Sequence, residues 1–536
     1  MEIYQIKGLT FSYPLSPRKI LKNLTFDIKE GDFVLVCGKS GSGKTSLLKH
    51  LKPAMTPHGE ITGDILFCGQ PLSSVSERRL ASEIGYVLQN PDNQLVTDKV
   101  WHELAFGLES LGVDSATIRL RVAEMASFFG IQTWFNKETS TLSGGQKQLL
   151  NLASIMAMQP KVLILDEPTS QLDPIAATEF LDTIKKINLE LGTTIIMSEH
   201  RLEETFVMAD KVIVMDEGEI ISYTSPTLMG KNIDKFSDSL LKFTPAAMQL
   251  FAVSGRTELE CPISVRDGRR FIDDYLNHVP KFVSQKTREK IIDKTDVLLE
   301  LKNIHFKYDK QLPDVLSNFN LKVKKNQWLA ILGGNGMGKS TSIGIIGGLL
   351  KAYRGKIINR SKSIGILPQD PQSLFIMNTV EKELYHTTKD KQKAHDIAEF
   401  TEIDHLLTQH PYDLSGGEQQ RLALCKVLLM DPEVILLDEP TKGLDNEFKE
   451  KLGRLLTKLI AEGKTIVMVS HDIEFCAMYA HECALSFNGE IITQGNPHEF
   501  FAGSSFYTTA ANRMVRHRWP ALITMPEVIN HVKKMG

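Results

Sequence analysis

The feature that most constrains this sequence is an internal duplication. Several residues of unlike type recur at equal intervals in the two halves of the chain. The matching intervals are Tyr13 to Lys44 and Tyr308 to Lys339, 31 residues each, and Ser143 to Asp166 and Ser415 to Asp438, 23 residues each. Equal spacing between unrelated segments is the mark of a repeated structural unit. The sequence therefore predicts two copies of one domain.

The 536 residues are too many for one hydrophobic core, which agrees with a division into domains. We expect a first domain at 1–225, a linker insert at 226–296, a second domain at 297–505 and a C-terminal tail at 506–536. The insert carries 12 Lys and Arg against 10 Asp and Glu and includes helical-looking pieces. It is therefore predicted to be a small folded segment and not a flexible tether.

Each half alternates short apolar runs with segments of helical periodicity. The runs include FVLVC from Phe33, VLILD from Val162 and TIIMS from Thr194. Such runs are typical of parallel strands buried on both faces of a sheet, with helices between them. The predicted fold class is α/β, with a mixed sheet core and a helical subdomain in each half.

A glycine-rich phosphate-binding pattern follows the first of these runs in each half. Its glycines let several backbone N–H groups point at one anion, at the start of a helix. The candidate phosphate-binding residues are Gly38, Ser40, Gly41, Gly43, Lys44, Thr45 and Ser46, and then Gly333, Asn335, Gly336, Gly338, Lys339, Ser340 and Thr341. The alternative is a glycine-rich turn with an incidental lysine, and the recurrence argues against it.

Acidic and histidine residues stand at the ends of later strands in both halves. Asp166 and Asp438 end an apolar run and are predicted to hold a metal ion, and Glu167 and Glu439 follow them as candidate general bases. His200 and His471 come just after another apolar run and are predicted to contact the terminal phosphate. The alternatives are helix-capping acids and structural histidines, which the repetition disfavours.

A third motif, LSGGQ at Leu142 and LSGGE at Leu414, precedes a predicted helix in each half. A serine and two glycines at a helix start form a second anion cradle. The alternative is a serine N-cap followed by permissive glycines.

Composition excludes several classes of function. The net charge of −3 argues against a general nucleic-acid-coating surface, and the six cysteines form no paired metal-binding spacing. The first residues lack a signal-peptide pattern, and no run approaches the roughly 20 apolar residues of a membrane span.

The ordered set of aromatic residue, phosphate loop, glutamine, LSGGQ, LDEP, LD and histidine resembles the nucleotide-binding domain of ABC ATPases, present twice. The resemblance implies that two domains pair head to tail, here within one chain, and that ATP and Mg²⁺ lie between the phosphate loop of one and the LSGGQ of the other. The first site would join Tyr13, Lys44, Thr45, Gln89, Asp166, Glu167 and His200 with Ser415, Gly416 and Gly417. The second would join Tyr308, Lys339, Ser340, Gln369, Asp438, Glu439 and His471 with Ser143, Gly144 and Gly145.

The same resemblance implies individual roles. Tyr13 and Tyr308 would stack on adenine, and Asp173 and Asp445 would couple the two sites. The Mg²⁺ ligands would be Thr45, Gln89 and Asp166 in one site, and Ser340, Gln369 and Asp438 in the other. Neither site lacks a part, so both are expected to hydrolyse ATP.

A narrower resemblance concerns FSYP at Phe11, NPDNQLVTDKVWHELAFGLE from Asn90, SEHRLEE from Ser198 and CPISVRDGRR in the insert. These stretches are similar to the fused ATPase subunits of energy-coupling-factor uptake transporters. The resemblance implies an integral membrane coupling subunit, a substrate-binding membrane subunit for a vitamin or metal ion, and a peripheral place on the cytoplasmic face of the membrane. The coupling subunit would dock near residues 89–107 and 369–385.

Three alternatives remain. Fused twin ABC ATPases also act on ribosomes as translation factors, but those have a strongly basic linker, whereas this one is nearly neutral, so no nucleic-acid partner is expected. A DNA-repair ATPase would carry zinc-binding cysteine pairs or a long coiled coil. An ABC exporter shares the ATPase motifs, so the choice of import depends on the narrower resemblance alone.

Overall fold

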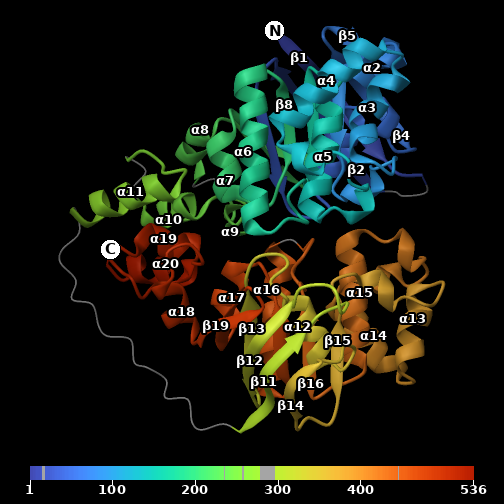
Figure 1. The fold of residues 1–536 in the computed structure, drawn as a ribbon. Coiled ribbons are helices and arrows are strands. Elements are labelled where there is room, and N and C mark those ends of the chain that lie inside the picture. The colour runs from blue at the N-terminus through green and yellow to red at the C-terminus, as the bar shows by residue number, and fades with distance from the viewer. Residues whose placement is uncertain (15–17, 234–235, 256–258, 278–295, 445, 536) are drawn as a thin grey trace. The chain divides into compact units, whose positions relative to one another are not determined.

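The structure is a computed structural model that describes residues 1–536 except 15–17, 234–235, 256–258, 278–295, 445 and 536. The chain forms two compact units, Met1–Asp273 and Asp274–Gly536 (Figure 1). Residues 226–273 of the predicted insert belong to the first unit, and the predicted tail belongs to the second.

The first unit is built on a six-stranded sheet. In order across the sheet, its strands are β10 (Glu219–Thr224), β9 (Lys211–Asp216), β3 (Phe33–Gly38), β8 (Thr194–Ser198), β7 (Val162–Asp166) and β6 (Ile84–Val87). All neighbours are parallel except β9 and β10, which form a hairpin that turns at Glu217 and Gly218. A smaller antiparallel sheet has the order β2 (Lys19–Lys29), β1 (Glu2–Ser12), β4 (Glu60–Phe67) and β5 (Gln70–Pro71).

The helices of the first unit are α1 (Lys44–His50), α2 (Glu77–Glu83), α3 (Val100–Ser110), α4 (Ser115–Phe128), α5 (Gly144–Met156), α6 (Pro174–Leu191), α7 (Leu202–Met208), α8 (Pro226–Lys231), α9 (Asp238–Leu241), α10 (Ala246–Ser254) and α11 (Val265–Asn277). Helices α1 to α7 lie between the strands of this unit along the chain, and α8 to α11 follow the last strand (Figure 1). The helical subdomain predicted for each half is formed in the first unit by α3 and α4, which pack with α5.

The second unit repeats this plan. Its six-stranded sheet has the order β15 (Ile364–Leu367), β16 (Val434–Asp438), β17 (Thr465–Val469), β13 (Trp328–Leu332), β18 (Glu482–Phe487) and β19 (Glu490–Gly495). Its smaller sheet has the order β12 (Leu316–Lys324), β11 (Val297–Phe306) and β14 (Arg354–Asn359). Its helices are α12 (Lys339–Ile346), α13 (Val380–Thr387), α14 (Lys391–Phe400), α15 (Gly416–Leu429), α16 (Asn446–Ala461), α17 (Ile473–Tyr479), α18 (Pro497–Gly503), α19 (Ala510–Val515) and α20 (Met525–Lys533).

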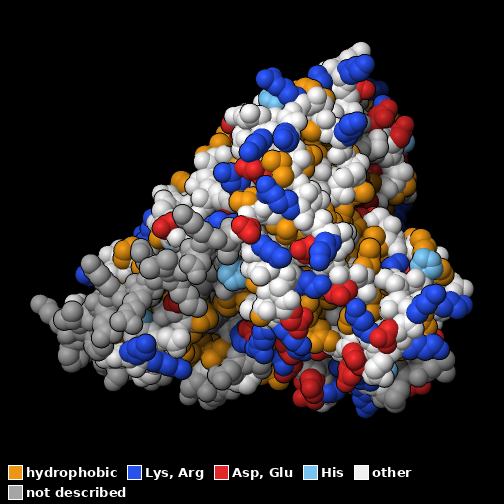
Figure 2. All heavy atoms as spheres, turned by 90° about the horizontal axis from the view of Figure 1, so that it is seen from below, with side chains coloured by type: hydrophobic (Ala, Val, Ile, Leu, Met, Phe, Trp, Pro, Cys, Tyr) orange, Lys and Arg blue, Asp and Glu red, His pale blue; other side chains and the backbone are white. Residues whose placement is uncertain are grey.

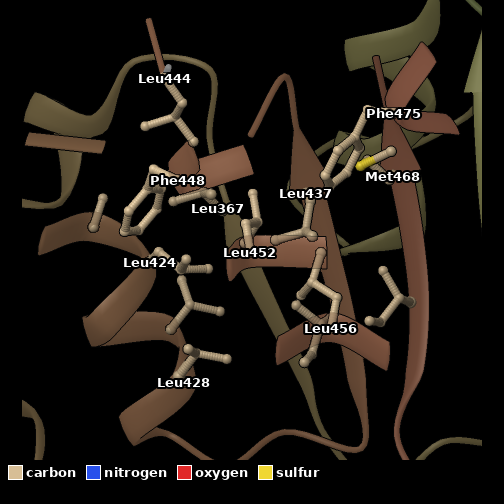
Figure 3. Packing of buried hydrophobic residues seen from close by; sticks show 14 of the residues in the cluster. Leu367, Leu424, Leu428, Leu437, Leu444, Phe448, Leu452, Leu456, Met468 and Phe475 are labelled. Atoms are coloured by element: carbon tan, nitrogen blue, oxygen red, sulfur yellow. The ribbon is translucent and has the colours of Figure 1, made fainter. Parts of the chain in front are cut away.

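Burial explains why the short apolar runs form central strands. Every residue of β3, β7 and β8 is buried, and the same holds for β13, β16 and β17. In the second unit, Leu437 and Met468 of neighbouring strands pack with Leu452 and Leu456 of α16 and Phe475 of α17 (Figure 3). The predicted α/β class with two tandem P-loop domains is confirmed.

The last helices of each unit are also alike. The N–H group of Ala246 at the start of α10 donates to Glu203 Oε1 at 2.6 Å, and that of Ala510 at the start of α19 donates to Glu474 Oε1, also at 2.6 Å. Glu203 and Glu474 occupy the first turns of α7 and α17. The duplication therefore continues into these helical segments. The predicted insert, which contains α10, ends the first copy of the repeat, and the predicted tail, which contains α19, ends the second copy.

None of the described helices combines the length and the apolar composition that crossing a bilayer requires.

Candidate functional site

The parallel strands bring the predicted residues of each half to one edge of its sheet. The phosphate loop follows β3, Asp166 ends β7, His200 comes after β8 and Gln89 comes after β6. Ligands of open α/β sheets bind at the carboxyl ends of the strands. The second unit places its phosphate loop, Asp438, His471 and Gln369 after β13, β16, β17 and β15 in the same way.

The phosphate loop of the first unit depends on backbone space at Gly38. Its φ is +140°, and a Cβ atom there would lie 2.0 Å from the carbonyl oxygen of Met215. Gly333 stands at the same place in the second unit, with φ of +149° and a Cβ position 2.3 Å from the Ser486 carbonyl oxygen. Only glycine fits either position, so both loops keep their tight turn.

The predicted phosphate-binding lysines lie inside these loops. Lys44 is buried, and its Nζ donates to the carbonyl oxygens of Gly38 and Lys39 at 2.9 Å each. Lys339 is buried too and donates to the Gly333 and Gly334 carbonyl oxygens at 3.0 and 2.8 Å. Each ammonium group thus stands in the turn of the loop, where it could meet a phosphate oxygen.

The remaining loop residues are placed less uniformly. Gly41 and Gly336 each have φ of +73° and open space around them, and Gly43 and Gly338 precede α1 and α12 in the left-handed region. Ser46 lies in α1, and Thr341 lies in α12. Ser40 and Asn335 lie in the turns themselves.

A hydroxyl and a carboxylate meet where a divalent cation was predicted. Thr45 Oγ1 donates to Asp166 Oδ1 at 3.1 Å, and burial raises the pKa of the Asp166 carboxyl above its ordinary value. Burial likewise raises the pKa of Asp438, where the Ser340 hydroxyl acts in the opposite direction. Asp438 Oδ1 is buried with no hydrogen-bond partner among the described residues. Hard oxygen ligands of this kind fit Mg²⁺, and a bound cation would offset the burial of each carboxylate.

In the first unit the predicted base, histidine and glutamine come together. His200 Nε2 lies 2.9 Å from Glu167 Oε1, and Gln89 Nε2 donates to Glu167 Oε2 at 2.9 Å. Burial raises the pKa of the Glu167 carboxyl, but the His200 imidazole and the Lys44 ammonium outweigh it, so the net pKa lies below its ordinary value. The carboxylate is therefore the favoured form of Glu167.

The second unit arranges the same residues differently. His471 directs its backbone N–H at Glu439 Oε2 at 3.1 Å, and its Nε2 lies 3.3 Å from Glu439 Oε1. That Nε2 also lies 3.0 Å from Asn335 Oδ1 and 3.2 Å from Lys339 Nζ. Burial raises the pKa of Glu439 to about 7 despite the nearby ammonium group of Lys339. Gln369 is exposed in this unit, as Gln89 is in the first.

These opposite pKa shifts predict opposite effects of two matched substitutions on the nucleotide-free chain. The folded pKa of Glu167 lies below its value of 4.5 in the unfolded chain, so its carboxylate contributes stability above that pH, which is lost as the pH falls. The folded pKa of Glu439 lies above 4.5, so its contribution is present at low pH and is lost as the pH rises through about 7. At pH 8, Glu167→Gln should lower Tm and Glu439→Gln should raise it.

Thermal unfolding in EDTA at pH 5 and pH 8 measures these shifts. The stabilisation by Glu439→Gln should shrink at pH 5, where the wild-type carboxyl is largely protonated. Tm shifts of the same sign at pH 8 would contradict the contrast between the two units.

The two predicted adenine-stacking residues are accessible. Tyr13 is 40% exposed and packs edge-on against Phe11, and Tyr308 is 61% exposed and packs edge-on against Phe306. The Tyr308 hydroxyl lies 3.0 Å from Thr341 Oγ1 at the start of α12. An exposed ring beside the phosphate-loop helix is suited to stack on a base.

The serines of LSGGQ and LSGGE stand at the N-caps of the helices that follow them, which agrees with the alternative of a serine N-cap. Ser143 Oγ accepts from the Gln146 N–H at 3.3 Å, and the Ser415 N–H donates to Glu418 Oε2 at 2.8 Å. Gly144 and Gly416 have open space around them, while Gly145 and Gly417 have close neighbours. Capping leaves these exposed helix starts able to face an anion, so their predicted role stays a prediction.

Of the predicted coupling residues, Asp173 caps α6 by accepting from the Ala176 N–H at 2.8 Å. Asp445 lies outside the described residues.

Sequence reasoning missed two residues that hold Asp166, the candidate metal-binding carboxylate of the first unit. Ser198 Oγ donates to Asp166 Oδ1 at 2.8 Å, and the Tyr86 hydroxyl lies 3.4 Å from Asp166 Oδ2. The second unit has Val469 at the position of Ser198, opposite Asp438 in the sheet. A polar residue at the end of an otherwise apolar strand was the available signal.

Comparison with known proteins agrees with this arrangement. The family model described as "ABC transporter" matches residues 21–170 and 316–442. A protein of Bacillus anthracis named "Putative ABC transporter ATP-binding protein" is 43% identical over 546 residues, covering 98% of this chain and 97% of the relative. A protein of the same name from Methanosarcina mazei is 32% identical over 536 residues, covering 93% of this chain and 90% of the relative.

Two solved structures are also similar. The archaeal ribosome recycling factor aABCE1, solved with the ribosomal stalk protein aP1, covers 92% of this chain and 91% of its own, with a TM-score of 0.59 and 20% identity. The structure of cbiO1 from Clostridium perfringens, part of the ABC transporter complex cbiONQ, is 32% identical, covers 44% of this chain and 93% of its own, and has a TM-score of 0.40. This chain belongs to the ABC transporter family and is an ATPase with two ATP-binding domains in tandem, because the family model matches both of its domains and the relatives are similar to it over nearly their whole length.

Proposed function

We propose that this chain is the ATP-hydrolysing subunit of a membrane transporter, of the energy-coupling-factor type that takes up a vitamin, a metal ion or a similar micronutrient. The observation that carries the transporter assignment is the 43% identity, over 98% of the chain, to a relative named as an ABC transporter ATP-binding protein. The uptake type is supported by the stretches from Asn90 and Ser198 and by the insert motif near Cys261.

In this proposal each half contributes a phosphate loop to one ATP site and an LSGGQ-type helix start to the other. Lys44 and Lys339 bind the phosphates, and Thr45 and Asp166, with Ser340 and Asp438, hold Mg²⁺. Bound Mg²⁺ neutralises charge on the phosphates. Gln89 and Gln369 would complete the metal shell, and in the first unit the Gln89 side chain lies beside Glu167.

Glu167 and Glu439 orient and deprotonate the attacking water in this scheme, and His200 and His471 contact the γ-phosphate. In the first unit, Glu167 and His200 already lie within hydrogen-bond distance. In the second unit, ATP would have to draw His471 towards the phosphate and away from Asn335.

The partners we propose are an integral membrane coupling subunit and a substrate-binding membrane subunit, with the chain on the cytoplasmic face of the membrane. Exposed aromatic residues suit docking near α3, where Trp101 is 43% and Phe106 is 38% exposed. In the second unit the corresponding helix α13 exposes Tyr385 at 37%. The two surfaces expose different aromatic side chains, which suits an asymmetric partner.

The rival function is that of a twin-domain translation factor. The likeness to a ribosome recycling factor, at 20% identity, shows a shared fold, and that fold serves both classes. Lys, Arg, Asp and Glu side chains are intermingled on the face drawn in Figure 2, and the net charge is −3. A mixed surface of this kind favours a protein partner over RNA.

Purification of the tagged chain from detergent-solubilised cells tests the proposal. We expect multi-span membrane proteins to co-purify in a fixed ratio. Recovery of ribosomes or RNA, with no chain in the membrane fraction, would overturn the transporter assignment in favour of the rival. The ATPase assignment would stand in either case.

Two variants sharpen this experiment. Trp101→Glu places a charge on the exposed face of α3 and should reduce co-purification of the membrane subunits, while the purified chain still hydrolyses ATP. Tyr385→Glu makes the same change on α13. Equal losses from the two variants would contradict asymmetric docking.

A further inference from the structure

The first unit contains a buried carboxylate next to its candidate catalytic residues that the second unit lacks. Glu199 directly precedes His200 and is 3% exposed. Ser470 holds the corresponding position before His471 and is fully buried. Neither the phosphate loop nor the metal site uses either residue.

Glu199 links two loops of the first site. Its Oε1 accepts from the backbone N–H of Thr169 at 3.1 Å and from the Thr169 hydroxyl. Its Oε2 accepts from the backbone N–H groups of His200 at 2.6 Å and Arg201 at 3.1 Å. Thr169 comes two residues after Glu167, so one side chain ties the loop of the candidate base to the loop of the candidate histidine.

The second unit connects the same loops more weakly. Thr441 Oγ1 lies 3.4 Å from Ser470 Oγ, which also accepts from the Asp472 N–H at 3.0 Å. The serine hydroxyl does not take the backbone N–H of His471, which donates to Glu439 instead. The catalytic carboxylate of the second unit is thus partly engaged by the backbone of the histidine loop.

We propose that Glu199 is a positioning residue of the first ATP site: by accepting the backbone N–H groups of the histidine loop, it leaves Glu167 facing the His200 imidazole. The inference rests on the proposed roles of Glu167 and His200. It implies that the two sites differ before nucleotide binds, with the first preorganised and the second requiring rearrangement of Glu439 and His471. Preorganised geometry speeds the chemical step more than it tightens substrate binding.

The test is an exchange of the two residues, measured one site at a time. Glu199→Ser is placed in a chain whose second site is silenced by Glu439→Gln, and ATP turnover is measured with the purified full-length chain. We expect kcat to fall about 10-fold or more while KM for ATP changes little, because the lost contacts orient the base and do not touch the nucleotide. Glu199→Gln should also lose activity, since an amide presents only one acceptor oxygen to two sets of donors.

A second variant chain distinguishes a positioning role of Glu199 from a general loss of structure. Glu199→Ser in the Glu167→Gln chain, where only the second site turns over, should leave the remaining rate unchanged. Equal losses in both backgrounds, or a KM that rises as much as kcat falls, would show a structural role and overturn the proposal. An unchanged kcat in the Glu439→Gln background would overturn it as well.

Two further outcomes of these measurements also decide the proposal. If silencing one site stops the other, the comparison is made with both glutamates intact, and an unchanged kcat for Glu199→Ser again overturns the proposal. If Glu167→Gln alone leaves turnover intact, the assignment of Glu167 fails and the proposal falls with it. The transporter assignment is not at stake, because the assay uses the purified chain without membrane subunits.

Discussion

Replacing either candidate catalytic glutamate by glutamine should slow ATP hydrolysis in its own site by about 10²-fold or more without loss of ATP binding. Glutamine keeps the shape of the side chain but cannot accept a proton from water. In the first unit, Glu167→Gln also replaces the carboxylate that faces His200. Steady-state hydrolysis and ATP binding by a fluorescent analogue, measured on Glu167→Gln and Glu439→Gln, provide the two readings.

Glu190→Gln is the matched control for this prediction. Glu190 lies in α6 and forms an exposed pair with Lys186 at 3.9 Å, so the same change of charge occurs away from the site. Its turnover should equal that of the unmodified chain. If either catalytic variant retained full turnover per site, the claim of two competent sites would fail.

Lys44→Ala and Lys339→Ala should instead weaken nucleotide binding. Each ammonium is buried in its phosphate loop and bonds two loop carbonyl oxygens, so alanine removes both the charge and a brace of the loop. A hydrogen bond to a charged group contributes about 1.5–3 kcal/mol, which corresponds to a rise in Kd of about 10- to 100-fold at the altered site. Equilibrium titration with a fluorescent ATP analogue measures each site.

A surface lysine gives the control. Lys22 on β2 of the smaller sheet pairs at 3.8 Å with Glu219 on β10 of the six-stranded sheet, and Lys22→Ala should leave both Kd values unchanged. If Kd were unaltered in Lys44→Ala, the first loop would not be a phosphate site.

Much of this architecture follows from the sequence because its signals are local. A phosphate loop needs glycines at fixed positions, and Gly38 and Gly333 show why, since a side chain at either would collide with a backbone carbonyl oxygen. The buried strands are apolar except near their ends, so the segments that form them and the residues at their carboxyl ends could be anticipated. The helical pieces of the insert were predicted for the same reason, and they form α10 and α11.

Other features could not be read from the sequence because they depend on contacts between distant segments. The roles of Ser198 and Glu199 appear only when β7 and β8 lie side by side and bring residues about 30 positions apart together. The difference between Glu167 and Glu439 has the same origin, since both follow an aspartate in an identical LDEP motif. Their pKa values diverge because the histidine loops approach them differently.

The most direct test of the central claim, a complete ATP site in each half, is a count of trapped nucleotides. The chain carrying both Glu167→Gln and Glu439→Gln is incubated with Mg²⁺ and radiolabelled ATP, separated from free nucleotide and assayed for bound ATP. Two complete sites predict two unhydrolysed ATP molecules per chain. One ATP per chain, or ADP in place of ATP, would contradict the claim.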